Sequence, residues 1–364
     1  MTAEASSEEP DEPATAVPST RHAATASSSA RPPVMNDVAR RAGVSHQTVS
    51  RVLNAPSSVR PPTRARVEAA IAELGYRRNL AARSLVTRRS HTLGVVAFDT
   101  DLHGPSSTLW AVERGAREAG FSVTIASVPS GASPAVRACL DRLVEQSVEG
   151  VVLVAPLDEA PAALGALPPG LPVVITAGQR VEGVSRASVD QVAGARLVVE
   201  HLLEAGHRTV HHVGGPRAWD EAVGRRSGWE QALRSAGRPV PEVLAGDWTP
   251  ASGHARALDL DGRGSTGPVT AVFAANDHMA LGVLRALRER GLRVPEDVSV
   301  VGFDDVPEAA YFAPPLTTVR QDFDALGLAG VRLLLEQLRT GVPGGRVVVP
   351  ARLVVRASTA APGR

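Results

Sequence analysis

Several residue types are scarce in this chain of 364 residues, and each shortage excludes a class of protein. Cys139 is the single cysteine, so the chain can form neither an intramolecular disulfide nor a cysteine-based metal site. No apolar run reaches the roughly 18 residues that a membrane span needs, and the first residues lack the basic start and apolar stretch of a signal peptide. We therefore expect a cytoplasmic protein that does not enter a membrane.

Enzyme motifs are missing as well. Neither HExxH nor GxSxG occurs, and the stretch that begins Val213-Gly-Gly-Pro is too short for a phosphate-binding glycine loop. His211 and His212 are adjacent in a predicted strand, where neighbouring side chains point to opposite faces, so they are not expected to bind one metal ion together. We expect no enzymatic activity, no metal and no cofactor.

Lysine is absent, so arginine carries all the positive charge besides histidine, and it is unevenly distributed. Residues 1–31 are rich in Ala, Ser, Thr, Pro and Glu, which predicts a disordered acidic tail. Twelve arginines face only three acidic residues between positions 31 and 91. Such a concentration of positive charge is typical of a surface that binds the phosphates of a nucleic acid.

The stretch VMNDVARRAGVSHQTVSRVL, residues 34–53, has the pattern of two short helices joined by a tight turn. The first helix is predicted to run from Asn36, as its N-cap, to Ala42, and Gly43 ends it because glycine adopts a left-handed turn without steric cost. Ser45 is the predicted N-cap of the second helix. An ordinary amphipathic helical hairpin has the same local pattern, so the context must decide between the two interpretations.

The polar side chains of the second helix gather near its N-terminus, opposite the apolar ones. Glutamine can pair with adenine and arginine with guanine in the major groove, whereas hydroxyl groups suit phosphate contacts. The predicted DNA contacts here are Ser45, His46, Gln47, Thr48, Ser50, Arg51 and Asn54.

A third helix, with Thr63 as its N-cap and Gly75 as its end, would complete a helix-turn-helix domain over residues 32–78. Its apolar stripe consists of Val67, Ala70, Ile71 and Leu74. Residues 79–90 follow, and their composition alone favours a solvated linker.

Beyond Thr92 apolar runs alternate with segments of helix length. TLGVVAF, FSVTIASV, GVVLVA, PVVITA, TVHHVG, AVFAAN and SVVGFD have the composition of strands that are buried on both faces. Repeated strand–helix units predict parallel sheets covered by helices, and residues 91–364 suffice for two lobes with a cleft between them. Ligands of such folds bind where strands end, although Asp277 and Asp305 at these positions are predicted to be helix N-caps.

The pattern from Asp37 to Asn54, DVAxxAGVSxxTVSRVLN, resembles the DNA-binding headpiece of the lac repressor family. The resemblance covers residues 34–362, and it is nearest to the lac-type members. It is carried by HGPSS (103–107), GDWTPASG (246–253), ANDHMALGVLRAL (275–287) and SVVGFDDVPEAAYFAPPLTTVRQDF (299–323). The resemblance implies an α/β protein in which a three-helix helix-turn-helix headpiece and a hinge helix precede a two-lobed domain with parallel sheets, like a periplasmic binding protein.

Residue by residue, the resemblance makes residues 79–90 a hinge helix and linker, with Leu85 as a wedge in the minor groove and Ala82 as a close contact. It also implies a pocket for an effector. The pocket residues would be Leu102, Pro105, Thr108, Arg225, Trp248, Asn276, Asp304, Gln321, Phe323 and Leu326. Two positions depart from the lac-type pattern: Ala177 replaces a pocket aspartate, and Glu221 replaces a pocket serine.

The function that the resemblance implies is repression of sugar-uptake or glycoside-hydrolysis genes. The protein would bind a palindromic double-stranded operator as a homodimer and be released by a small sugar, such as a β-galactoside or another glycoside. No leucine heptads follow the segment VVVPARLVVRAST, so we expect a dimer and not a tetramer. Two alternatives stay open: a regulator whose ligand acts as a co-repressor, and a sugar-binding transport protein with the same two-lobed fold.

Overall fold

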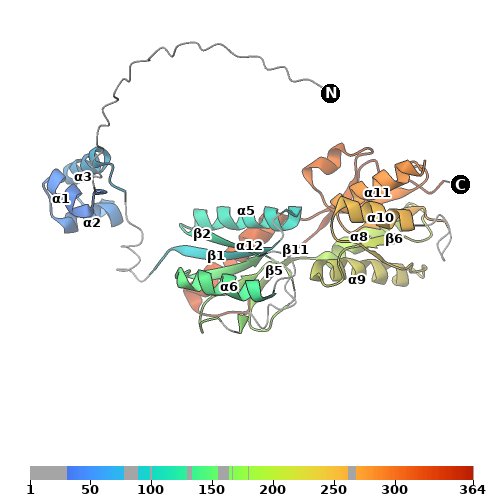
Figure 1. Cartoon of the computed structure of the whole chain (residues 1–364), viewed down its shortest axis with the longest axis horizontal. Helices are drawn as coiled ribbons and strands as arrows, with labels where there is room; N and C mark the ends of the chain where they lie inside the picture. Colours follow the sequence, from blue (N-terminus) through green and yellow to red (C-terminus); the bar gives the residue numbers. More distant parts are fainter. Residues whose placement is uncertain are drawn as a thin grey trace, which may run out of the picture. The chain divides into compact units, whose positions relative to one another are not determined.

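The computed structural model describes residues 31–77, 89–98, 101–128, 133–154, 164–165, 167–178, 180–260 and 268–363 (Figure 1). The chain divides into two units, Met1–Asn79 and Leu80–Arg364. The predicted tail up to residue 30 lies outside the described residues, and so do Ala82 and Leu85 of the predicted hinge helix. No helix in the described part of the chain is long and apolar enough to cross a lipid bilayer.

The first unit contains the predicted three-helix domain. Its elements are α1 (Met35–Ala42), α2 (His46–Asn54), the 3-10 turn η1 (Pro56–Ser58) and α3 (Pro61–Leu74). Gly43 and Gly75 end α1 and α3 in the left-handed conformation, with φ angles of 66° and 61°, as predicted. Val38, Val49 and Val67, one from each helix, are fully buried and belong to the same hydrophobic core.

Two predicted N-caps of this unit were wrong. The N-cap of α1 is Val34, whose backbone N–H donates to the carboxylate of Asp37 at 2.9 Å. The helix can begin before Asn36 because Asp37, in its first turn, accepts the Val34 N–H and places a negative charge at the helix N-terminus. Helix α3 begins at Pro61, before Thr63, because proline has no N–H that would need a cap and its fixed φ suits the first turn.

The second unit has two lobes. The sheet of the N-terminal lobe has the order β11-β5-β4-β3-β1-β2, and all its strands are parallel. Its strands are β1 (Thr92–Phe98), β2 (Ser122–Val128), β3 (Gly150–Val154), β4 (Val173–Ile175), β5 (Ser185–Val189) and β11 (Arg346–Val349). Its helices are α5 (His103–Glu118), α6 (Ser133–Glu145) and α12 (Phe323–Thr340). Helices α5 and α12 pack on the face that contains Val95, and α6 packs on the face that contains Val96.

The sheet of the C-terminal lobe has the order β12-β10-β9-β8-β6-β7, with only the β10–β12 pair antiparallel. Its strands are β6 (His211–Gly214), β7 (Leu244–Ala245), β8 (Ala271–Ala274), β9 (Ser299–Asp304), β10 (Thr317–Arg320) and β12 (Arg352–Val354). Its helices are α8 (Gln191–Glu204), α9 (Asp220–Ser235), α10 (Pro250–Asp259), α11 (Asp277–Glu289) and the 3-10 helix η2 (Pro307–Tyr311). Helices α8 and α9 cover one face and α10 and α11 the other.

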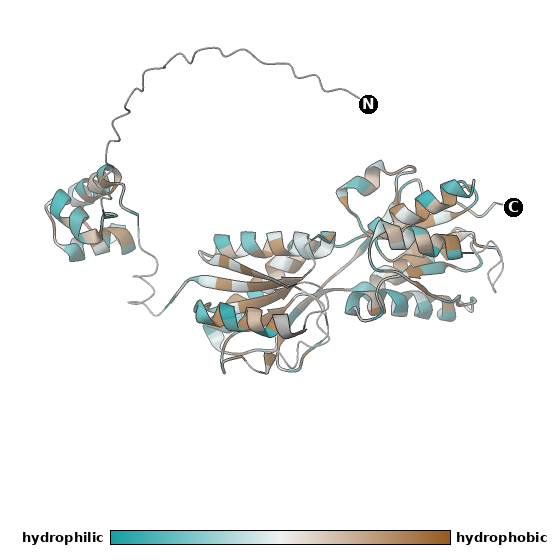
Figure 2. Cartoon of the chain, in the orientation of Figure 1, coloured by the Kyte–Doolittle hydropathy of each residue, from teal (hydrophilic) through white to brown (hydrophobic). Residues whose placement is uncertain are grey.

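All seven predicted apolar runs contain a strand, so the predicted fold class is confirmed. The strands are the most hydrophobic part of each lobe and lie between layers of helices (Figure 2). Five strands were missed: β5, β7, β10, β11 and β12. Strand β5, Ser-Arg-Ala-Ser-Val, alternates buried and half-buried residues, and β7 has only two residues, so neither forms a continuous apolar run.

The chain passes between the lobes three times. It leaves the N-terminal lobe after β5, returns after β10 into α12, and leaves again after β11 into β12 (Figure 1). Gln191 begins α8 after the first passage, and Gln321 lies in the second. The passages therefore bring two polar side chains to the junction of the lobes.

Candidate functional site

Helix α2 exposes the polar side chains that were predicted to contact DNA. His46, Gln47 and Arg51 are exposed, while Val49 and Val52 hold the opposite face of the helix in the core. Ser45 is the N-cap, as predicted, and its Oγ accepts a hydrogen bond from the backbone N–H of Thr48 at 3.1 Å.

The remaining hydroxyl groups of this helix make local hydrogen bonds. The Oγ of Ser45 lies 2.9 Å from the hydroxyl oxygen of Thr48. Asn54 Nδ2 donates to Ser50 Oγ at 3.2 Å, one turn further along the helix. His46, Gln47 and Arg51 are exposed, and their side chains are of the types that can hydrogen-bond a base edge.

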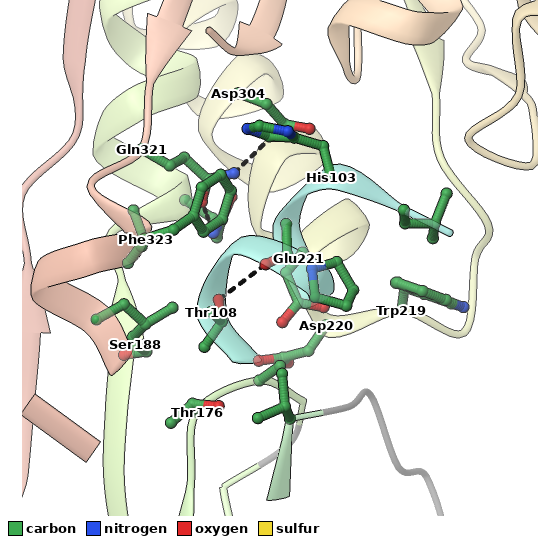
Figure 3. Close-up of a pocket in the computed structure, with 18 of the residues that line it drawn as sticks. His103, Thr108, Thr176, Ser188, Trp219, Asp220, Glu221, Asp304, Gln321 and Phe323 are labelled. Atoms are coloured by element: carbon green, nitrogen blue, oxygen red, sulfur yellow. Dashed lines mark hydrogen bonds between the residues drawn. The ribbon is translucent and has the colours of Figure 1, made fainter. Parts of the chain in front are cut away.

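The ten residues predicted to form the effector pocket all line one cavity between the two lobes (Figure 3). The cavity holds about 770 Å³ of space not occupied by atoms, including a part open to solvent. Leu102, Pro105 and Thr108 come from the start of α5, and Phe323 and Leu326 from the start of α12. The other five come from the C-terminal lobe: Arg225, Trp248, Asn276, Asp304 and Gln321.

Four polar side chains at this junction form a closed ring of hydrogen bonds and one ion pair. Arg225 Nε donates to Gln191 Oε1 at 2.8 Å, and Gln191 Nε2 donates to Gln321 Oε1 at 2.7 Å. Gln321 Nε2 donates to Asp304 Oδ1 at 2.6 Å, and this oxygen lies 3.4 Å from Nη2 of Arg225. The ring thus connects two passages between the lobes with α9 and the end of β9. Sequence reasoning predicted three of its members and missed Gln191.

The guanidinium of Arg225 is almost completely buried, with 4% of the residue exposed. Burial lowers its pKa, although the Asp304 carboxylate opposes that change. Its central carbon lies 4.0 Å from the ring centroid of Phe303, and one of its Nη groups donates to the carbonyl oxygen of Ala275. Burial raises the pKa of Asp304, while Arg225 acts in the opposite direction. Each charge is therefore tolerated in the interior because the other compensates it.

Asp277 and Asp305 are not helix N-caps, contrary to the prediction. Asn276 caps α11 by accepting the N–H of Met279 at 2.8 Å. Asp277 is fully buried, and its two carboxylate oxygens accept hydrogen bonds from Val306 N–H and from the hydroxyl of Thr318. Asp277 lies one position beyond the cap, so its side chain is buried, and residues that are distant in sequence supply its donors.

Asp305 instead bonds to two arginines, Arg320 at 2.5 Å and Arg356 at 2.6 Å. The backbone at this point is unusual: Asp304 and Asp305 have φ angles of 112° and 55°. The two bonds from Asp305 hold it in this conformation. Left-handed backbone at residues other than glycine costs on the order of 1–3 kcal/mol and is often found at functional sites. Here it turns the Asp304 side chain into the pocket.

The first turn of α9 contacts the N-terminal lobe across the pocket. Asp220 Oδ2 lies 2.7 Å from Nη2 of Arg186 on β5, and Glu221 Oε1 accepts the backbone N–H of Gly178 at 3.0 Å. Arg186 and Asp220 line the pocket but were not predicted. Arg186 belongs to a strand that the sequence pattern concealed, so its position at the cleft could not be recognised.

His211 and His212 belong to the core of the C-terminal lobe. His212 is stacked on Phe273 with ring centroids 4.6 Å apart, and its Nδ1 lies 3.0 Å from the Phe273 carbonyl oxygen. Burial lowers the pKa of His212 to about 4, so the ring is neutral. Within the described ranges no group of three or more His, Cys, Asp or Glu side chains could hold a metal ion.

The buried carboxyl group of Asp277 should make the stability of the protein depend on pH. Burial raises its pKa well above 3.8, so the folded protein keeps a proton that the unfolded chain releases, and stability is lost as the pH rises through the raised value. Asp277→Asn can preserve the hydrogen bonds without titrating. We expect its free energy of unfolding, relative to the original protein, to increase from about pH 5 to pH 8 in urea titrations.

Asp297→Asn is the control for this experiment. Arg293 lowers the pKa of Asp297 to about 2, so this carboxylate stays charged throughout the same pH range, and the difference should be constant. A constant difference for Asp277→Asn as well would contradict the account of its buried carboxyl group.

Two known families match this chain. Residues 34–79 match the family of bacterial regulatory proteins called the lacI family, and residues 199–359 match the periplasmic binding protein-like domain. The lactose operon repressor of Escherichia coli is 37% identical over 334 residues, which are 91% of this chain and 92% of that protein. The regulator CelR of Thermobifida fusca is 37% identical over 343 residues, 89% of this chain and 96% of that protein.

Solved structures agree with these matches. The lac repressor dimer bound to operator and the anti-inducer ONPF has a TM-score of 0.83 and 36% identity, over 91% of this chain and 100% of that one. The complex of CelR with cellobiose has a TM-score of 0.67 and 35% identity, over 90% of this chain and 99% of that one. This chain therefore belongs to the lacI family of bacterial regulatory proteins, and it is a DNA-binding transcriptional regulator and not an enzyme.

Proposed function

We propose that this regulator represses sugar-uptake or glycoside-hydrolysis genes, and that a small glycoside in the pocket between the lobes releases it from its operator. The observation that carries the proposal is the pocket itself. Ten residues that are scattered over more than 200 positions of sequence line one cavity, and the polar side chains among them suit hydroxyl groups. Such a regulator acts in the cytoplasm, where the chromosome lies.

The pocket has the polar and apolar groups that recognise a sugar ring. Asp304, Asn276 and Arg225 offer acceptors and donors to neighbouring hydroxyls, although each already has protein partners that a ligand would have to join or replace. Phe323 and Trp219 offer flat apolar faces on which the C–H face of a ring can pack (Figure 3). The relatives that bind ONPF and cellobiose support a glycoside over other small molecules.

The exposed side chains of α2 support a role in reading operator sequence. His46, Gln47 and Arg51 would contact base edges, and Ser45, Thr48, Ser50 and Asn54 would contact phosphates or position the helix. We propose residues 32–78 as the DNA-binding domain and residues 79–90 as a hinge helix with Leu85 as its wedge. Residues 91–364 would then form the effector-binding and dimerisation domain.

The lobes offer a surface for a second copy of the chain. Helices α5 and α12 pack together, and each exposes a large apolar side chain, Trp110 with 72% and Leu328 with 38% of the residue accessible. Such residues on a monomer commonly mark an interface. A symmetric dimer would place two copies of α2 on the half-sites of a palindromic operator.

Control would come from the arrangement of the lobes. A glycoside that contacts both lobes stabilises the arrangement in which it fits best, and the paired hinge helices would not form in that arrangement. A coupling of about 1–3 kcal/mol between the two sites would change operator affinity about 5- to 150-fold. If the ligand instead strengthened operator binding, it would be a co-repressor.

Gln47→Ala tests the DNA-reading surface. We expect it to weaken binding to an operator selected from random duplexes by about 1–3 kcal/mol, because one paired base contact is lost. Binding to unrelated DNA should not change. Fluorescence anisotropy measures both affinities, and Ala65→Ser on the exposed side of α3 is the control. Equal losses on both DNAs would argue against base reading by Gln47.

Phe323→Ala tests the pocket. In the original protein, one class in a panel of galactosides, glucosides and xylosides should release the operator. In the variant, the concentration needed for release should rise at least about tenfold, because the ring loses an apolar contact, while operator affinity stays the same. Phe121→Ala, a half-buried phenylalanine outside the pocket, is the matched control. Tight operator binding that no sugar disturbs would overturn the glycoside proposal.

Trp110→Asp tests the dimer surface. A charge in the centre of an apolar interface is costly, so we expect sedimentation analysis to find a monomer where the original protein is a dimer. Val342→Asp places the same charge at another exposed apolar position and should leave the dimer intact. Unchanged assembly of the Trp110 variant would place the interface elsewhere.

A further inference from the structure

Three buried polar atoms of the pocket residues have no hydrogen-bond partner in the described part of the chain. They are Oε2 of Glu221, Nε1 of Trp248 and Nε of Arg186. All three residues line the cavity between the lobes. Buried polar atoms are nearly always paired in native proteins, so a bound molecule is the natural partner of these three.

The three atoms differ in what they require. Glu221 Oε2 is an acceptor and needs a donor from the ligand, whereas the nitrogen atoms of Trp248 and Arg186 are donors and need acceptors. A carboxylate or phosphate on the ligand would supply only acceptors, and an ammonium group only donors. Hydroxyl groups supply both, so a polyhydroxylated ring satisfies all three atoms.

The charges of the pocket favour an uncharged ligand as well. The five charged side chains that line it include two pairs, Arg186 with Asp220 at 2.7 Å and Arg225 with Asp304 at 3.4 Å. Glu221 is the fifth, and no ion pair within the described ranges involves it. The charged side chains that line the pocket therefore sum to one negative charge, which would repel an anionic ligand.

The carboxylate of Glu221 is also held in place. Its Oε1 accepts the backbone N–H of Gly178, which belongs to the opposite lobe. With one oxygen anchored across the cleft, the carboxylate is held among the side chains that line the pocket (Figure 3). A ligand hydroxyl that binds Oε2 is thereby connected to both lobes through one side chain.

We propose that Glu221 is the specificity-determining residue of this pocket. Its Oε2 accepts a hydrogen bond from a ligand hydroxyl, so the effector is an uncharged glycoside, and uronates and sugar phosphates are excluded. This inference rests on the proposed function, because it assigns a ligand class to the same pocket. It goes further by naming the charge of the ligand and the residue that selects it.

The test compares matched neutral and anionic sugars by calorimetric titration of the full-length protein. The probes are methyl β-glucoside and methyl β-galactoside with their uronides, and lactose and cellobiose with their 6-phosphates. The original protein should bind the neutral member of a pair at least about tenfold tighter than the anionic member, because like charges repel in the pocket. In Glu221→Gln this preference should fall to about threefold or less, because glutamine removes the charge while its amide group can still hydrogen-bond to a ligand hydroxyl, which both donates and accepts.

Two variants complete the experiment. Asp324→Asn removes one negative charge outside the pocket, where Asp324 pairs with Arg114 at 3.0 Å, and should keep the preference. Glu221→Ser also removes the charge, with a smaller side chain, so it repeats the test if the Glu221→Gln variant fails to fold.

The outcomes separate this inference from the proposed function. Equal affinity of the original protein for both members of a pair would overturn the role of Glu221, and so would an unchanged preference in both Glu221 variants. If no sugar of either charge binds while the operator is still bound, the glycoside effector itself is wrong, and the inference fails with it.

Discussion

A closed ring of Arg225, Gln191, Gln321 and Asp304 is the interaction on which the two-lobed unit depends. Two of its members lie where the chain passes between the lobes, and the other two lie on α9 and at the end of β9. A buried charge without a partner is costly, and the ring compensates the charges of both Arg225 and Asp304. A ligand that replaces one bond of the ring therefore acts directly on the segments that set the arrangement of the lobes.

The first turn of α9 connects this ring to the opposite lobe. Asp220 and Glu221 contact Arg186 and Gly178, while Arg225 on the next turn belongs to the ring. One helix thus contributes to the pocket, to the ring and to the contacts with the N-terminal lobe. A pocket whose two walls are joined by a few polar contacts can change between two arrangements at a modest cost in free energy, which is the property that an effector requires.

The sequence predicted the fold well where the physical signal was local. Gly43 and Gly75 ended their helices because the left-handed turn requires glycine, and continuous apolar runs identified the central strands. The pocket residues came from a resemblance, since no local pattern brings Leu102 and Phe323 together. Predictions failed where tertiary contacts decide. Asp277 is buried because Val306 and Thr318 offer donors to its carboxyl group, whereas Arg186 lies in β5 and Gln191 follows that strand, which has no continuous apolar run.

The central claim is that a ligand in the cleft changes the arrangement of the lobes. Its most direct measurement is the distance between spin labels at Glu118→Cys and Ser235→Cys, two exposed positions on opposite lobes, with Cys139→Ser to remove the native thiol. The account predicts that the glycoside which releases the operator shifts this distance distribution, and that a glycoside without effect on DNA binding does not. Release of the operator with an unchanged distance distribution would contradict it.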